Sequence, residues 1–201
     1  NGDIVSGKPF ATQPILEARD ANGNVDVDLA GSAVISIESG GASLAGTTTQ
    51  PWSNGRATFD NLAVSHPTDG TAFTLQASAN ELAVAITAPL TSDVVASQLV
   101  YVQEIGHNSV PNGDILSGVA FQTQPIVEAQ DASGALDLHF QDPIALSANT
   151  GTLSGTATVQ AQAGRATFSD LAYTATADQE LFQLWAANQP TDTNDNLPQK
   201  A

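Results

Sequence analysis

The sequence has no cysteine and no methionine, and only 5 of its 201 residues are lysine or arginine. Without cysteine there is neither a disulfide framework nor a thiolate metal site. The three histidines, His66, His107 and His139, are too scattered for a zinc site. The fold must therefore be stabilised by packing and hydrogen bonds alone. Because methionine is absent, we expect a matured protein or a piece of a longer one.

Positive charge is scarce, and the 21 aspartates and glutamates give a formal net charge of −16. A field of that sign repels phosphate backbones and anionic lipid surfaces, so we expect no nucleic-acid partner. Apolar residues never run for the ~20 positions that crossing a bilayer requires, which predicts no membrane insertion in this segment. An acidic surface keeps molecules soluble and gathers cations, as suits a protein exposed to calcium-containing fluid.

The chain does contain an internal repeat. The segment Asn1 to Asp26 returns at Asn112 to Asp137 with 17 of 26 positions identical. Further on, Gly55 to Phe59 (GRATF) returns at Gly164 to Phe168, but the offset has fallen from 111 to 109 residues. The length difference lies between Asp26 and Gly46, which predicts a loop there. A repeat of about 110 residues has the size of one folding domain.

Both copies consist of short runs of alternating apolar and polar residues, separated by Gly, Asn, Asp and Pro. This pattern is typical of antiparallel β-sandwiches, and no helix is predicted. We place one domain over residues 1–95 and a second over 96–201. The predicted strands of the first are 10–19, 33–38, 47–50, 56–64, 71–78 and 81–87. Those of the second are 98–103, 121–130, 143–148, 156–160, 165–173 and 180–187.

Each predicted domain lacks one terminal strand. The run Gln98 to Gln103 (QLVYVQ) precedes the second copy and has no counterpart before Asn1, while the polar segment Pro190 to Ala201 stands where the first copy has Glu81 to Thr87. Two explanations are open: a fragment of a longer array, or a sheet edge completed by a strand from a neighbouring molecule. The linker is predicted at Pro89 to Ser97.

The repeated pattern Ser-Gly-x-x-Phe-x-Thr-Gln-Pro-Ile-x-Glu-Ala-x-Asp-Ala-x-Gly occurs at Ser6 to Gly23 and Ser117 to Gly134. Together with Gly-Arg-Ala-Thr-Phe-x-x-Leu, it resembles the bacterial immunoglobulin-like repeats of invasins, intimins and long adhesins. The resemblance covers nearly the whole chain. It implies two tandem immunoglobulin-like antiparallel β-sandwiches, whose function in such proteins varies from spacer to adhesive tip to accessory domain of secreted enzymes.

Four aspartates are the candidate metal ligands: Asp69, Asp93, Asp131 and Asp137. In a seven-stranded sandwich their loops would face the junction between the domains, and hard carboxylate oxygens in that number suit Ca²⁺. The alternative is four solvated loop acids. The segment Asp20 to Asn24 also has the residue types of a calcium loop, but it lacks the Glu of an EF-hand, and an Asx-Gly turn at Asn22-Gly23 explains it fully.

Two other residue types, arginine and tryptophan, have two interpretations each. Arg56 and Arg165 are repeated cations, which we expect to pair with a nearby carboxylate rather than to bind a ligand. Trp52 and Trp185 are candidates for sugar stacking or for packing. No nucleophile, base and oxyanion donor can be assigned together, so we expect no enzyme.

From these patterns we expect an extracellular, secreted or cell-surface module: a stalk or spacer with an adhesive role, stiffened by Ca²⁺. Two alternatives remain open, a filament subunit that exchanges strands and a carbohydrate-binding accessory module. The expected partners are accordingly a surface ligand, a glycan or copies of the chain itself.

Overall fold

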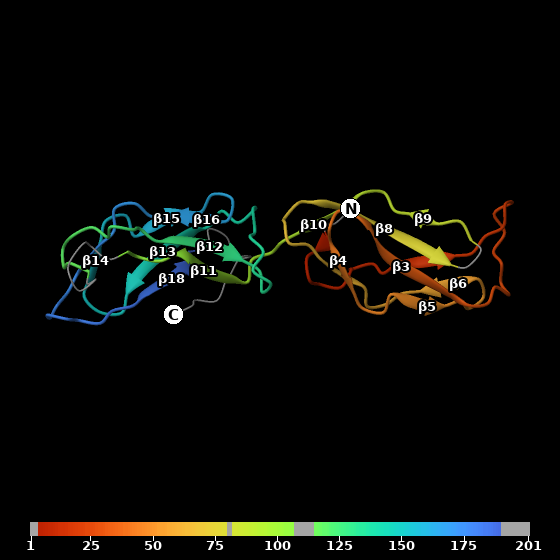
Figure 1. The fold of residues 1–201 in the computed structure, drawn as a ribbon, viewed down its shortest axis with the longest axis horizontal. Coiled ribbons are helices and arrows are strands. Elements are labelled where there is room, and N and C mark those ends of the chain that lie inside the picture. The colour runs from red at the N-terminus through yellow and green to blue at the C-terminus, as the bar shows by residue number, and fades with distance from the viewer. Residues whose placement is uncertain (1–3, 80–81, 107–114, 190–201) are drawn as a thin grey trace. The chain divides into compact units, whose positions relative to one another are not determined.

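The computed structural model describes residues 4–79, 82–106 and 115–189. These residues form strands and turns without a helix, which confirms the all-β prediction (Figure 1). The chain divides into two compact units, Asn1–Val94 and Val95–Ala201. This boundary differs by one residue from the boundary predicted from the repeat.

In its described residues, 4–79 and 82–94, the first unit has ten strands, joined in three sheets. The largest sheet has the order β1-β10-β8-β3-β5, with β9 also paired to β8, and the pairs β2-β6 and β4-β7 stand beside it. The bounds are β1 (Ile4–Val5), β2 (Ile15–Glu17), β3 (Ser32–Ser39), β4 (Ser43–Ala45), β5 (Thr49–Pro51), β6 (Arg56–Thr58), β7 (Ala63–Ser65), β8 (Ala72–Ala79), β9 (Ala85–Ile86) and β10 (Leu90–Asp93).

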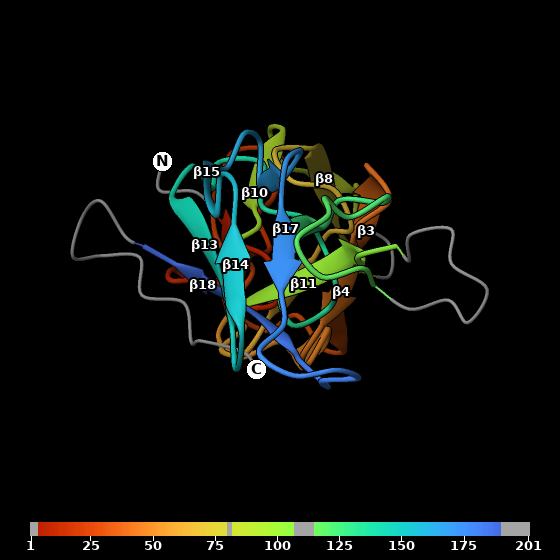
Figure 2. The ribbon, with the colours of Figure 1, turned by 90° about the vertical axis from the view of Figure 1, so that its left-hand side faces the viewer.

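The part of the second unit that the structure describes has eight strands in three sheets, β11-β12-β16, β15-β13-β18 and β14-β17. The last pair lies side by side in Figure 2. The bounds are β11 (Gln98–Gln103), β12 (Ile126–Gln130), β13 (Pro143–Ala148), β14 (Thr152–Ser154), β15 (Thr158–Gln160), β16 (Arg165–Thr167), β17 (Ala172–Thr174) and β18 (Leu184–Asn188).

Each unit buries its own apolar core, because alternate residues of the strands point inward. In β3, for example, Ala33 and Ile35 are buried while their neighbours are exposed. Phe59, Leu62 and Phe73 fill the first core. The second core is larger, and its buried members are Ala96, Leu99, Phe121, Val127, Ala129, Phe140, Ile144, Leu146, Ala161, Ala166, Phe168, Leu171, Tyr173 and Ala186.

The long predicted strands 56–64 and 165–173 are each interrupted. In the first unit, β6 pairs with β2 and then β7 pairs with β4, so the chain leaves one sheet and joins another at residues 59–62. The same change occurs between β16 and β17. The predicted strands 10–19 and 121–130 were also too long. The observed strands begin only after Pro14 and Pro125, because proline has no N–H to donate to a neighbouring strand.

The predicted linker was wrong in part, because residues 90–93 form strand β10. This strand pairs antiparallel with β8 and parallel with β1, in the register Ile4↔Ser92 and Val5↔Asp93. One parallel pair therefore interrupts the expected all-antiparallel arrangement. The alternation rule missed β10 because Ser92, a small polar residue, is its most buried member, at 1% exposed.

The length difference between the copies lies between the middle of β3 and the start of β4. Cross-strand partners equate Ser36 with Ser147 at an offset of 111 and Ser43 with Thr152 at 109. The connections that follow β3 and β13, residues 40–42 and 149–151, have equal length, whereas the pairing of β3 with β8 shifts register between Ile37 and Ser39. The predicted length difference is therefore narrowed to the span from Ser36 to Ser43, which includes the irregular end of β3.

A repeated glutamine holds the segment where the chain changes sheets. The Gln124 side-chain oxygen accepts the Leu171 N–H at 2.9 Å, and its amide donates to the carbonyls of Phe121 and Leu171 at 3.0 and 3.1 Å. Gln13 makes the corresponding bonds to Leu62 and Phe10. The Thr-Gln-Pro repeat thus satisfies backbone groups that no strand pairs.

Replacing Gln124 with alanine should lower the free energy of unfolding of the second unit by about 2 kcal/mol, because it leaves the buried Leu171 N–H without a partner. The measurement is chemical denaturation followed by Trp185 fluorescence in a Trp52→Phe background. Gln162→Ala is the control, since that side chain is exposed. Equal destabilisation by both substitutions would contradict the assigned role.

Candidate functional site

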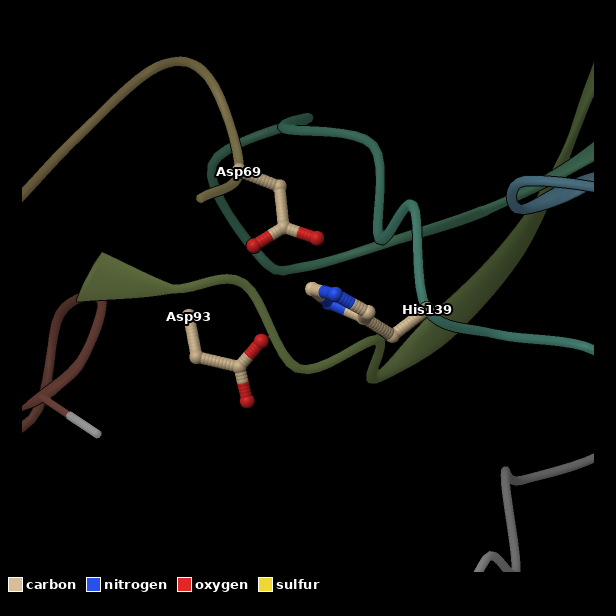
Figure 3. A group of neighbouring side chains, drawn as sticks. All are labelled: Asp69, Asp93 and His139. Atoms are coloured by element: carbon tan, nitrogen blue, oxygen red, sulfur yellow. The ribbon is translucent and has the colours of Figure 1, made fainter. Parts of the chain in front are cut away.

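Two of the predicted metal ligands lie close together in the first unit. Asp69 precedes β8 and Asp93 ends β10, and their carboxylate oxygens come within 4.8 Å of each other. Figure 3 shows the two carboxylates pointing into the same space; His139, also drawn there, belongs to the second unit. Asp69 is only 6% exposed, and one of its oxygens accepts the Val94 N–H at 2.9 Å. Two close carboxylates supply part of the six to eight oxygen ligands that Ca²⁺ takes.

The other two predicted ligands bind backbone groups of the second unit. Asp131 accepts the N–H groups of Ser133 and Ala135 at 2.8 and 2.9 Å, which closes a turn. Asp137 is 8% exposed and accepts the N–H groups of His139, Phe140 and Ala96 at 2.9, 3.0 and 2.9 Å. The sequence offered these residues as candidate metal ligands or solvated loop acids and did not predict their role as caps, although both belong to Asx-rich turns that signal it.

The connection between the units is held from each side by a carboxylate. Asp69 binds the N–H of Val94 within the first unit, and Asp137 binds the N–H of Ala96 within the second. Only Val95 separates these two held positions. The segment that joins the units is therefore short, in contrast to the nine-residue linker expected at 89–97.

The segment Asp20 to Asn24 forms an Asx turn. One Asp20 oxygen accepts the N–H groups of Asn22 and Asn24 at 2.9 and 2.8 Å, and the other accepts the Asn24 side-chain amide at 3.0 Å. These bonds hold the pKa of Asp20 below its usual range, and the bond from the Asn24 side-chain amide has the largest effect. Asp26 behaves differently: the neighbouring Asp28 carboxyl shares a hydrogen bond with it and raises the pKa of Asp26.

The two repeated arginines form the expected ion pairs. Arg56 donates to Glu17 at 2.8 Å and Arg165 donates to Glu128 at 2.9 Å, each between directly paired residues of adjacent strands. Arg19 also pairs with Glu17, and both arginines lower the pKa of that carboxyl. The repeated Glu and Arg therefore join adjacent strands.

A polar cluster around Glu180 was not predicted. Its carboxylate accepts the hydroxyls of Thr150, Tyr173 and Thr176 at 2.6, 2.8 and 2.7 Å, and the Thr176 N–H at 2.8 Å. These bonds lower the pKa of Glu180 to about 2, and the bond from Thr150 has the largest effect. No comparable residue occurs in the first unit, where the aligned position is Thr71. The repeat that guided the sequence analysis could not reveal it.

Aromatic residues of the second unit border a shallow apolar groove between β11 and β18. The groove has a volume of about 450 Å³ and is lined by Leu99, Tyr101, Glu104, Ile105, Phe182, Gln183, Leu184 and Ala186. Phe182 stacks on Tyr173 with ring centroids 3.7 Å apart. Trp185 is 43% exposed, whereas Trp52 packs against the first core. The two tryptophans thus occupy different environments.

His66 has a structural role. Its ring Nε2 lies 2.6 Å from the Gly40 carbonyl, to which it donates, while Nδ1 accepts the Thr68 N–H at 3.1 Å. The side chain is 5% exposed and holds the Gly40–Ala42 turn. His107 lies outside the described residues. Among residues 4–79, 82–106 and 115–189 there is also no helix of the length and apolar character that crossing a bilayer requires.

The Glu180 cluster should make the stability of the second unit depend on acid. A carboxyl whose folded pKa is depressed stabilises the fold above its unfolded pKa, here 4.5, and loses that contribution as the pH falls toward 2. We expect the stability difference between the parent and Glu180→Gln to be largest above pH 5 and to shrink steadily down to pH 2.5. Thermal unfolding across that range measures it, with Asp178→Asn as the exposed control. A difference independent of pH would contradict the assignment.

No protein-family model matches the chain, and no curated protein matches it. Among solved structures, the chain is similar to the apo structure of Bacteroides uniformis beta-glucuronidase 3, with 11% identity and a TM-score of 0.34. The similarity covers 98% of this chain and 23% of that chain, so this chain spans less than a quarter of that protein. A likeness at that TM-score supports no inference about fold, activity or substrate.

Proposed function

We propose that the chain is a non-catalytic structural and adhesive module of a bacterial surface or secreted protein, built from two immunoglobulin-like β-sandwiches. It serves as a stalk or spacer that works outside the cell. Three observations support this proposal: the duplicated all-β unit, the acidic surface, and the use of repeated side chains such as Gln13, Gln124, Glu17 and Glu128 to hold strands and turns.

The observation that carries the proposal is the parallel pair β1-β10. These strands are the first and last of the first unit, and the Ser6 N–H donates to the Asp93 carbonyl at 2.9 Å. The Ser6 hydroxyl also binds the backbone of His66, accepting its N–H at 3.1 Å. When the unit is pulled from its two ends, adjacent parallel strands slide along each other, so their hydrogen bonds are loaded together. This arrangement suits a module that bears tension.

Stretching the full chain from its two ends in a force spectrometer should give two separate unfolding events. Ser6→Pro should lower the force of one event, because proline removes the N–H that Asp93 accepts. Ser6→Ala, which keeps this N–H and loses only the hydroxyl, is the matched control and should lower the force less. Extension without resolvable force peaks would contradict a load-bearing role.

Calcium is the ion we propose for the carboxylate pair Asp69 and Asp93. Two like charges within 4.8 Å repel each other, and a divalent cation would offset that repulsion. The pair lies where β10 leaves the first unit, so a bound ion would brace the strand that carries load.

Calcium at about ten times its Kd should raise the free energy of unfolding of the first unit by about 1.4 kcal/mol relative to EDTA. Asp93→Asn should abolish this gain, whereas Asp60→Asn, which removes an exposed acid of the same unit, should retain it. The measurement is denaturation followed by Trp52 fluorescence in a Trp185→Phe background. Identical curves with calcium and EDTA would remove calcium from the proposal without affecting the tension-bearing role.

A further inference from the structure

The equivalent strands β2 and β12 have different neighbours in their two units. In the second unit β12 lies between β11 and β16, and all five of its residues have partners in β11. Its counterpart β2 pairs with β6 on one side, and none of the described residues forms a strand on its other side. The two strands are near-identical, ILE against IVE, so sequence does not explain the difference. An open edge of this kind is a template for strand addition.

The residues of β2 are more exposed than the matching residues of β12, because β2 has no described strand beside its open edge. Val127 is 0% exposed and Glu128 is 7% exposed in the second unit, whereas the matching Leu16 and Glu17 are only half-buried. Ile15 is 60% exposed. In the second unit Leu99, from β11, is 4% exposed within the core, and Tyr101 packs against that core. The first unit has no described side chains in these two positions.

The turn after β2 also retains the anchor for a strand at this edge. Asp137 uses one oxygen for the N–H groups of His139 and Phe140 and the other for the N–H of Ala96, two residues before β11. Asp26 likewise binds the N–H groups of Asp28 and Leu29. Where Asp137 binds Ala96, however, Asp26 shares a hydrogen bond with the Asp28 carboxyl.

We propose that the free edge of β2, with Asp26 as its anchor, is an acceptor site for an extended polypeptide strand with the chemistry of Ala96–Gln103. The strand runs antiparallel to β2 in the register that β11 keeps with β12, which sets the position of Leu99 opposite Ala18 and that of Tyr101 opposite Leu16. Its N-terminal N–H replaces Asp28 as the partner of Asp26. This inference does not depend on the stalk function.

The occupant is defined by three requirements. It needs apolar side chains at the two positions equivalent to Leu99 and Tyr101, because these face the core of the unit. It needs a backbone N–H two residues before the paired segment, and it cannot carry proline where β11 uses its N–H groups. A second copy of this chain does not provide such a strand, since its own β11 is already paired with β12.

The test uses the full chain and a fluorescently labelled synthetic peptide of residues 95–103, VASQLVYVQ. We expect saturable binding by fluorescence anisotropy and slower amide hydrogen exchange at Ile15–Glu17, with no change at Ile126–Gln130. Two control peptides, a scrambled sequence and Val100→Pro, should bind at least about tenfold more weakly, because they lose the register or a ladder hydrogen bond.

Two matched protein variants separate the anchor from general stability. Asp26→Ala should weaken peptide binding about fivefold to tenfold, since a charged acceptor is lost. Asp28→Ala should leave binding equal or tighter, because it frees Asp26, and circular dichroism checks that both variants remain folded. The proposal is overturned by equal binding of all peptides, by absence of binding, or by protection at β12 in place of β2. It is also overturned if the chain alone protects Ile15–Glu17 as its concentration rises, because a second copy would then be the occupant.

Discussion

The structure depends on side chains that complete the backbone hydrogen bonding of very short strands. Many strands have only three residues, and each sheet change leaves N–H and carbonyl groups that no ladder satisfies. Gln13 and Gln124 bind these groups where the chain passes between sheets. Aspartates do the same at the turns, with Asp20 and Asp131 as the clearest cases. In a chain without disulfides, these bonds and two small cores determine the fold.

This requirement also explains the distribution of charge. Many of the acidic residues are not simply solvated surface charges, because their carboxylates accept hydrogen bonds from specific backbone N–H groups. Asp69 and Asp137 illustrate the point, since both are nearly buried and each binds an N–H beside the boundary between the units. Glu128 joins two strands through Arg165. Acidic residues with such roles are fixed in position.

The sequence predicted the all-β class and the division near residue 95, because the repeat and the period-two alternation report directly on strands and their inward faces. It failed where burial does not follow side-chain type. Strand β10 was assigned to a linker because its buried member is Ser92, and the backbone hydrogen bonds of Asp131 and Asp137 were not predicted because capping depends on backbone direction. Glu180 could not be found by comparing the copies, since the first unit has no equivalent.

The parallel pair of β1 and β10 has a consequence for the order of folding. These strands are separated by almost the whole length of the first unit, so their contact closes a loop of about 85 residues and is entropically late. On a ribosome the unit cannot complete its sheet until residues 90–93 have emerged. The pairing of β11 with β12 spans a much shorter segment. The β11-β12 pair can therefore form after a much shorter length of its own unit has been made.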